Sequence, residues 1–354
     1  MPAAVKVALR ETFSEKTSVP VTRPITIRDV ARRAEVGVGT VSRVMSNSPK
    51  VAAETRERVL RAAEELNYVP NSVAGSLASR RTRVVAMLVP TLGNSIFAET
   101  VDGAAERLTQ DGFQLMLGNT GYSQELEDQL TLAFLGRRPE GLILTGTRHS
   151  PTTLRVLHDA GIPIVETWEL PETALDLAVG FSNANAARDM TAHMLARGYR
   201  QIVMLGRPPG MERRNDQRLQ GYAGAMQAQG LSPRFVHSSR PLDQHMTAGA
   251  AGLHDLRREY PDADAVFCAD DIHAAGLLFE CQRLGLAVPD DLAIAGFGDF
   301  PVAAGVHPRL TTVRIPGHDI GRTAAELILD RRNGADIPDT SFDLGYEIIP
   351  RETT

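Results

Sequence analysis

The fold of the N-terminal part is decided by the stretch Thr26-Ile27-Arg28-Asp29-Val30-Ala31, followed by Val36 and by Thr40-Val41-Ser42-Arg43-Val44. Thr26 with Asp29 three residues later is a capping-box pattern, which marks the start of a helix. Apolar residues then return at the spacing of one helix face, at Ile27, Val30, Ala31 and Ala34. After a break at residues 35–37, a second short helix places Val41, Val44 and Met45 on its inner face.

A third helix is expected from about Ala53 to Leu66, after a loop at residues 46–49. Its pattern buries Val59, Ala62, Ala63 and Leu66 and exposes Arg56, Arg58 and Arg61. Two short helices across a tight turn, braced by a third, are typical of a helix-turn-helix unit. The helical pattern alone leaves open a three-helix unit that does not bind DNA.

The distribution of charge supports the DNA-binding alternative. Residues 1–83 contain 15 Lys and Arg against 8 Asp and Glu, whereas the remaining residues contain 23 basic and 35 acidic side chains. A basic head followed by an acidic body indicates that only the head meets a polyanion.

Composition excludes several classes of protein. The chain has 354 residues, more than one hydrophobic core usually serves, so two or three domains are expected. It has no apolar run of about eighteen residues, and residues 1–20 lack the apolar core of a signal peptide. Its two cysteines, Cys268 and Cys281, fit neither a disulfide framework nor a zinc site. We therefore expect a cytoplasmic protein with no membrane partner, no metal and no other cofactor.

From residue 83 onward, short apolar runs alternate with amphipathic stretches. The expected strands are Val84–Val89, Gln114–Leu117, Gly141–Leu144, Ile164–Val165, Leu177–Val179, Ile202–Leu205, Ala265–Phe267 and Leu292–Ala295. The expected helices include Phe97–Leu108, Ala184–Leu195, Gln217–Gln229 and Asp271–Leu284. This alternation predicts an α/β fold with doubly wound parallel sheets, arranged as two lobes.

The motifs of the head resemble the LacI/GalR family of bacterial transcription repressors. A further run, Asn67-Tyr68-Val69-Pro70-Asn71 with Ala74 and Leu77, resembles that family's entry into a hinge helix, and the resemblance covers roughly residues 25–352. It implies a homodimer that binds a pseudo-palindromic operator and is not an enzyme. It also implies a body similar to periplasmic sugar-binding proteins, with a small-molecule effector held between two lobes.

The resemblance divides the chain into four segments. Residues 1–24, which lack periodicity, are a disordered lead-in. Residues 25–70 are an all-α helix-turn-helix domain, and residues 71–82 are a hinge helix and linker. Residues 83–354 are the two-lobed domain for effector binding and dimerisation.

The second helix is expected to enter the major groove, where base edges are read. By the resemblance, Val38 and Gly39 take the main base-reading positions, and Arg43 lies one turn further on. Thr40 and Ser42 suit phosphate contacts. The sequence departs from the family at Gly37 and Ala52, which replace capping residues, and at Gly39, which has no side chain to read a base. Base reading therefore moves onto Val38, Arg43 and Ile27.

The hinge helix is expected over Asn71–Ser79. It is too short to be stable alone in water, and Gly75 disfavours it by roughly a further 1 kcal/mol. Such a segment folds when it is docked in DNA beside its dimer partner, with Asn71 and Ala74 among the contacts. Leu77 matches the position that wedges into the minor groove at the operator centre.

Effector contacts are expected where strands end in the cleft between the lobes. The resemblance assigns Arg218 to ligand binding, and its forked donors suit a carboxylate or paired hydroxyls. It assigns Asp271 to sugar hydroxyls. Asn94 and Phe97, after the first strand, fit a pocket wall and a ring-stacking contact. Further candidates follow later strands: Tyr122, Glu166, Trp168 and Asn183.

Several stretches resemble the gluconate-repressor branch of the family, which senses sugar acids. They are Gly141–Thr145, Val179–Phe181, Cys281–Leu286, Val288–Asp291 and Ala293–Phe297. The run Glu212-Arg213-Arg214 adds positive charge that suits a carboxylate. The sequence shows no C-terminal heptad segment, so a dimer is expected rather than a coiled-coil tetramer.

Three alternatives compete with a sugar-acid repressor. An enzyme could use His273 with Asp270 and Asp271, but all three fall at the start of one helix, and no nucleophile elbow or phosphate-binding loop accompanies them. A secreted sugar-binding protein conflicts with the helix-turn-helix motif. A regulator of the same family that senses a neutral sugar or a purine, or that activates transcription, stays open.

Overall fold

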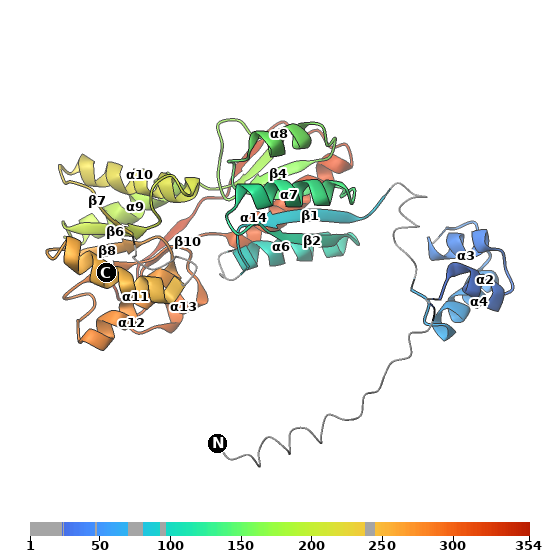
Figure 1. The fold of residues 1–354 in the computed structure, drawn as a ribbon, viewed down its shortest axis with the longest axis horizontal. Coiled ribbons are helices and arrows are strands. Elements are labelled where there is room, and N and C mark those ends of the chain that lie inside the picture. Colours follow the sequence, from blue (N-terminus) through green and yellow to red (C-terminus); the bar gives the residue numbers. More distant parts are fainter. Residues whose placement is uncertain (1–22, 24, 47, 70–80, 93–96, 238–244) are drawn as a thin grey trace, which may run out of the picture. The chain divides into compact units, whose positions relative to one another are not determined.

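The computed structural model describes residues 23, 25–46, 48–69, 81–92, 97–237 and 245–354. It divides into two compact units, Met1–Thr82 and Arg83–Thr354, called here the head and the body (Figure 1). The predicted lead-in and most of the predicted hinge lie outside the described residues. None of the described helices combines the length and the apolar character needed to cross a membrane.

Three helices form the head: α2 (Ile27–Arg33), α3 (Val38–Met45) and α4 (Ala53–Glu65). They close around Val30, Val41 and Val59, which are fully buried. The start of α2 is fixed by Asp29, whose Oδ2 accepts hydrogen bonds from the amide (2.9 Å) and hydroxyl (2.7 Å) of Thr26. As the sequence predicts, α3 and α4 begin at Gly37 and Ala52 without a side-chain cap.

Two details of α4 differ from the sequence prediction. Arg56 is half-buried rather than exposed, because its guanidinium donates to the backbone carbonyl of Ser48 in the preceding loop. Leu66, the residue after the helix, is half-buried and packs at the edge of the head core.

The first lobe of the body comprises residues 83–180 and 317–344. Its parallel sheet has the order β11-β5-β4-β3-β1-β2, formed by β1 (Val84–Val89), β2 (Gln114–Asn119), β3 (Leu142–Thr145), β4 (Ile164–Thr167), β5 (Leu177–Gly180) and β11 (Ser341–Asp343). Its helices are α6 (Ala98–Gln110), α7 (Gln124–Leu135), α8 (Pro151–His158) and α14 (Gly317–Arg332). Alternate residues of β1 pack on opposite sides: Val85 and Met87 lie in the core with α6 and α14, and Ala86 and Leu88 lie with α7 and α8.

The second lobe comprises residues 183–314 and 347–354. Its parallel sheet has the order β7-β6-β8-β9, formed by β6 (Ile202–Gly206), β7 (Arg234–His237), β8 (Ala265–Cys268) and β9 (Ala293–Ala295). The helices are α9 (Asn183–Ala196), α10 (Arg213–Ala228), α11 (His245–Glu259), α12 (Asp271–Leu284) and the short α13 (Pro301–Gly305). Helix α9 packs against α10, and α11 packs against α12. The two lobes confirm the predicted α/β class with parallel sheets wound by helices.

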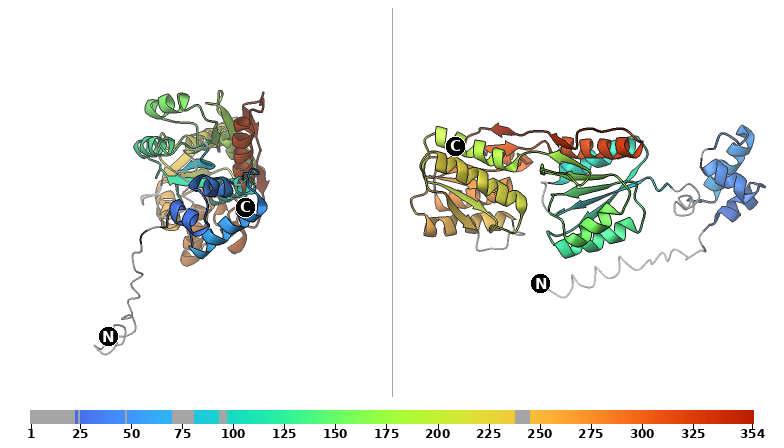
Figure 2. Two further views of the ribbon diagram at one scale, coloured as in Figure 1. Left: turned by 90° about the vertical axis from the view of Figure 1, so that its right-hand side faces the viewer. Right: turned by 90° about the horizontal axis from the view of Figure 1, so that it is seen from above.

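The chain crosses between the lobes three times, between β5 and α9, between β10 (Thr312–Arg314) and α14, and between β11 and β12 (Glu347–Ile349) (Figure 2). Strands β10 and β12 pair antiparallel, with Val313 opposite Ile348. The last residues return to the second lobe, where the carbonyl of Thr353 accepts a 2.8 Å hydrogen bond from the amide of Ile294. Each lobe is therefore completed by a segment distant in the sequence.

Candidate functional site

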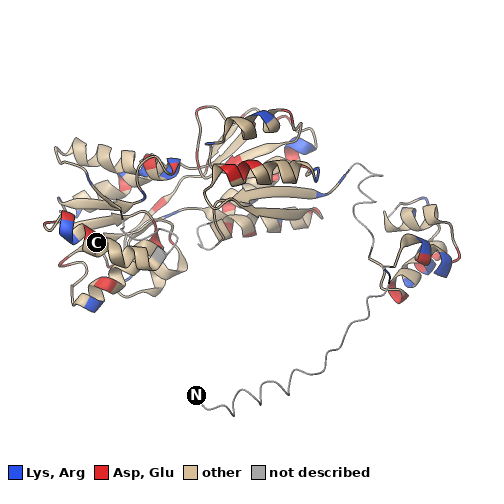
Figure 3. Ribbon diagram, viewed as in Figure 1, with Lys and Arg blue, Asp and Glu red and all other residues tan. Residues whose placement is uncertain are grey.

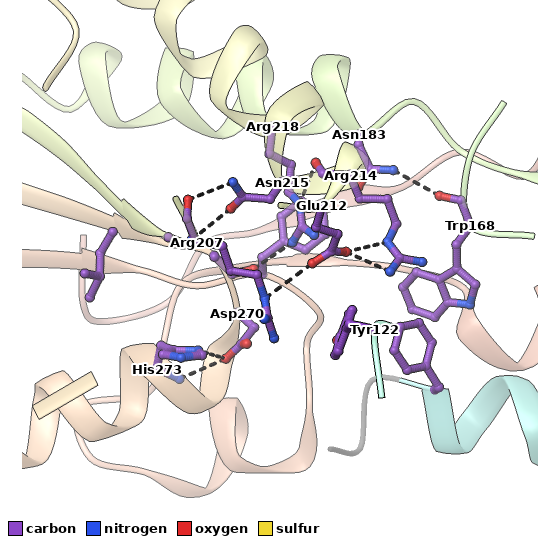
Figure 4. Close-up of a pocket in the computed structure, with 15 residues that line it drawn as sticks. Tyr122, Trp168, Asn183, Arg207, Glu212, Arg214, Asn215, Arg218, Asp270 and His273 are labelled. Atoms are coloured by element: carbon purple, nitrogen blue, oxygen red, sulfur yellow. Dashed lines mark hydrogen bonds and ion pairs between the residues drawn. The ribbon is translucent and has the colours of Figure 1, made fainter. Parts of the chain in front are cut away.

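The candidate effector site is a cavity between the lobes, at the carboxyl ends of strands from both sheets (Figure 4). Its empty space is about 630 Å³, part of it open to solvent. The first lobe contributes only aromatic rings, and every charged side chain comes from the second lobe. The lining residues are Phe97, Tyr122, Trp168, Asn183, Leu205, Gly206, Arg207, Glu212, Arg214, Asn215, Arg218, Ala269, Asp270, His273 and Phe297.

The aromatic wall is held in one arrangement. The rings of Phe97 and Trp168 meet edge to face with centroids 5.1 Å apart, and Trp168 Nε1 donates to the hydroxyl of Thr100 over 3.2 Å. Trp168 has a left-handed backbone (φ 74°), and its carbonyl accepts a 3.0 Å hydrogen bond from Nδ2 of Asn183. Asn183 therefore fixes this wall, while it also lines the cavity.

The opposite wall is built at the start of α10 and the loop before it. Glu212 lies among three guanidinium groups: its Oε1 is 2.7 Å from both Nε and Nη2 of Arg214, and its Oε2 is 3.4 Å from Nε of Arg207. Burial raises the pKa of Glu212, but the charges of Arg214, Arg218 and Arg207 outweigh burial and hold that pKa below its usual value. Glu212 is therefore an anion fixed inside a basic site.

Arg218, the ligand-binding arginine of the sequence analysis, lines the cavity and is buried. Its Nε donates to the carbonyl of Arg214 (3.2 Å), and its Nη1 donates to the carbonyl of Ala269 (2.7 Å). Its guanidinium carbon lies 4.5 Å from the ring centroid of Phe297. Burial lowers the pKa of Arg218. The residue thus ties α10 to the end of β8 while it forms part of the wall.

The structure contradicts the predicted contact between Asp271 and an effector. Asp271 is 0% exposed and does not line the cavity. Its Oδ1 accepts from the hydroxyl of Thr312 (2.5 Å) and its Oδ2 from the amide of Phe300 (2.8 Å). Burial raises the pKa of Asp271 to about 7. The preceding residue, Asp270, lines the cavity instead.

Glu166 is also placed away from the cavity. Its Oε2 accepts from the amide of Leu175 (2.8 Å), and its Oε1 lies 3.5 Å from Nε2 of His149. The other ring nitrogen of His149 lies 2.6 Å from Oε1 of Glu127. Burial alone would lower the pKa of His149, but the two glutamates raise it to about 9. The predicted effector contact of Glu166 is therefore wrong, because its carboxylate is engaged within the first lobe.

Eight lining residues were not predicted as effector contacts from the sequence: Leu205, Gly206, Arg207, Asn215, Ala269, Asp270, His273 and Phe297. Two of them could have been found because they follow strands, Arg207 directly after β6 and Asp270 two residues after β8. The backbone of Arg207 is fixed by Asn215, whose side-chain amide accepts from its N–H (3.2 Å) and donates to its carbonyl (3.0 Å). Of the remaining candidates, Tyr122 lines the cavity, and Asn94 lies outside the described residues.

The candidate DNA-contact residues of the head differ in exposure. Val38 is 43% exposed although it begins the amphipathic helix α3, and a Cβ at Gly39 would meet nothing within 4 Å. Ser42 and Arg43 are exposed, and Thr40 is half-buried. Ile27 is half-buried and packs against the head core, and its contact with a base stays a prediction. Basic positions mark the helices of the head (Figure 3), and Asn71, Ala74 and Leu77 lie outside the described residues.

Comparisons with known proteins give matches to the head and to part of the body. Residues 26–71 match the family described as "Bacterial regulatory proteins, lacI family", and residues 191–354 match a periplasmic binding protein-like domain. The chain is 39% identical to the HTH-type transcriptional regulator GntR of Escherichia coli and 34% identical to IdnR of the same species; each match covers 93% of this chain and 98% of the relative. A crystal structure of a LacI-family transcriptional regulator from Silicibacter pomeroyi superposes with a TM-score of 0.85 at 33% identity, covering 93% of this chain and 99% of that one. The chain therefore belongs to the LacI family of bacterial regulatory proteins.

Proposed function

We propose that this protein is a transcriptional repressor that binds operator DNA as a homodimer and leaves it when a sugar acid binds between the lobes. The observation that carries the effector class is the charge of the cavity wall. Three arginines and two carboxylic acids line the cavity, so the wall carries one excess positive charge. A ligand with a single carboxylate would neutralise it.

The shape of the site supports a polyol chain attached to that carboxylate. Phe97 and Trp168 offer ring surfaces to the C–H groups of a sugar, while Asp270 and Asn183 provide polar atoms for its hydroxyls. Since the aromatic rings belong to one lobe and the charges to the other, a ligand that needs both would favour closure of the lobes.

DNA binding is supported by the head. Val38 exposes an apolar side chain at the start of α3, and Ser42 and Arg43 lie exposed on the same helix. An exposed helix of this kind in a helix-turn-helix unit is inserted into the major groove. We assign base contacts to Val38 and Arg43 and phosphate contacts to Thr40 and Ser42. Gly39 permits close approach of the backbone to the DNA.

One observation favours a second candidate, a regulator that senses a neutral sugar. Glu212 already pairs with Arg214 at 2.7 Å, so part of the positive charge of the site is compensated within the protein. A neutral ligand would then meet a nearly balanced wall.

The two effector classes are separated by a gel-shift titration. An operator is first selected from random DNA with the purified protein, and it is then titrated with gluconate, 2-ketogluconate, 6-phosphogluconate, glucose and hypoxanthine. We expect release by gluconate and 2-ketogluconate. Release by 6-phosphogluconate should be weaker, because its phosphate adds negative charge beyond the single excess positive charge of the cavity wall. Release by glucose or hypoxanthine alone would contradict the sugar-acid assignment. Tighter operator binding in the presence of gluconate would contradict release by the effector and indicate an activator instead.

Leu77→Ala is expected to weaken operator binding by roughly 1–3 kcal/mol, because a smaller side chain supports less unstacking and bending of the DNA. Effector affinity should stay unchanged, since the position belongs to the hinge and not to the cavity. Fluorescence anisotropy with labelled operator measures the first quantity and calorimetry the second. Equal operator affinity for variant and parent would show that the hinge assignment is wrong.

A further inference from the structure

Arg214 is a cavity residue with a hydrogen-bond donor that the described residues leave unused. It is only 5% exposed, and among the described residues its buried Nη1 has no hydrogen-bond partner. Its other two nitrogens both point to one oxygen of Glu212. Its guanidinium carbon lies 5.3 Å from the ring centroid of Phe97, so the group faces the aromatic wall across the cavity (Figure 4). A buried guanidinium N–H in a cavity is a donor suited to a ligand oxygen.

Glu212 occupies the position that an acidic ligand would take on this guanidinium. It is the residue before α10, yet its side chain makes no capping hydrogen bond to that helix. The carboxylate is directed to Arg214 and Arg207 instead. Nε of Arg207 lies 3.4 Å from Oε2 of Glu212, and the guanidinium carbon of Arg207 lies 4.4 Å from the ring centroid of Tyr122, so a second cation is in place beside Glu212.

We propose that Arg214 holds the acid group of the effector, and that Glu212 is a built-in carboxylate which the effector displaces from Arg214 towards Arg207. This inference rests on the proposed sugar-acid function and assigns the specificity of the same site. Two donors of Arg218 are bound to backbone carbonyls, one of them that of Arg214. Arg218 therefore positions Arg214 and does not itself hold the acid group.

The exchange selects for acids. A ligand carboxylate replaces one anion on Arg214 by another, and so the buried guanidinium keeps a counter-charge throughout. A neutral hydroxyl that displaced Glu212 would leave that guanidinium without its paired carboxylate and with the charge of Glu169 alone, which is unfavourable in a buried site. Glu212 therefore lowers the affinity of the site for acids modestly and its affinity for neutral ligands strongly.

The test compares calorimetric affinities for gluconate and for sorbitol, which has a neutral CH₂OH in place of the carboxylate. In Arg214→Gln, we expect gluconate to bind about 10- to 100-fold more weakly, while sorbitol changes little, because only the acid uses the lost charge-assisted bonds. The matched control is Arg213→Gln, which removes the same charge one residue away. Arg213 pairs with Glu169 over 3.2 Å and lines the adjoining open pocket rather than this cavity. Its effect on gluconate should stay below about 3-fold.

The variant Glu212→Gln shows whether Glu212 competes with the ligand for Arg214 or only supports the fold of the loop before α10. If Glu212 competes with the ligand, the variant binds gluconate about 3- to 10-fold more tightly and also binds sorbitol better. This gain should vanish in the Glu212→Gln/Arg214→Gln double variant. If Glu212 only supports the fold of the loop, Glu212→Gln weakens both ligands and lowers the melting temperature.

The outcomes distinguish this inference from the proposed function. If the unmodified protein binds gluconate but Arg214→Gln binds it equally well, or if Glu212→Gln binds it more weakly, the inference is overturned and the sugar-acid function stands. If the unmodified protein binds neither gluconate nor 2-ketogluconate, the proposed function itself fails. A melting curve of each variant identifies those that do not fold. If Arg214→Gln does not fold, Arg214→Lys replaces it in the test. That variant keeps the charge but has a single donor group, so we expect an intermediate loss of gluconate affinity.

Discussion

Arg218→Ala is expected to give a repressor that stays on its operator at every concentration of sugar acid. The substitution removes one of the three cavity arginines and leaves the carbonyls of Arg214 and Ala269 without their donor. It also opens the wall over Phe297. We expect the released state to lose about 100-fold in effector affinity, because Arg214, to which we assign the acid group, loses the bond that positions it and two buried carbonyls are left unpaired. Moving an operator from nearly full to nearly empty needs the effector to prefer the released state by roughly 5 kcal/mol summed over two sites, so losing this preference abolishes induction at any effector concentration.

The measurement is operator occupancy with and without gluconate, by gel shift. Arg218→Lys serves as the control, because it keeps the charge but not the forked donors, and it should be released only at raised gluconate concentration. Operator binding by Arg218→Ala also reports that the head is folded, and its melting temperature reports on the body. Release of Arg218→Ala at the gluconate concentration that releases the unmodified protein would remove Arg218 from the site.

Operator affinity is expected to fall by about 10⁴- to 10⁵-fold between 50 and 200 mM salt. The head is basic, with exposed Arg28, Arg43 and Lys50 among its side chains. About 8–10 phosphate contacts per dimer would give a slope near −8 in a plot of log affinity against log salt.

The slope is measured by fluorescence anisotropy over a range of salt concentrations, with a palindromic operator and with a single half-site. The half-site should bind far more weakly, because it uses one head of the dimer. A slope near zero, or equal affinity for the two sites, would contradict binding of a dimer through its basic heads.

The sequence was sufficient for the elements whose burial is complete. Strand β1 was predicted with its observed bounds because Val84–Val89 is a continuous apolar run in the interior of a parallel sheet. The head helices were also predicted, since each has apolar residues at helical spacing, with Val30, Val41 and Val59 as their buried members. The strands β7, β10, β11 and β12 were missed. They have only three or four residues, and half-exposed positions such as Arg234 and exposed Glu347 interrupt any apolar pattern.

The sequence predicted where the cavity lies but only some of the residues that line it. Phe97, Trp168 and Arg218 follow strands or belong to a recognisable motif, and the fold brings them to one cavity. The choice between Asp270 and Asp271 could not be made from the sequence. Neighbouring residues at a helix start point in directions about 100° apart, and only the packing of α12 against Thr312 and Phe300 decides which carboxylate is enclosed.

The interleaved path of the body affects how the protein is made on the ribosome. Strand β11 pairs with β5 in the first lobe, and Thr353 binds Ile294 in the second, so the last segment finishes both lobes. During synthesis, the head emerges before the body and can bury its own core, whereas neither lobe is complete until β11 has left the exit tunnel. A chain that terminates before β11 would therefore lack part of each lobe at once, with the edge of β5 uncovered. Termination before residue 341 cannot yield a body with one finished lobe.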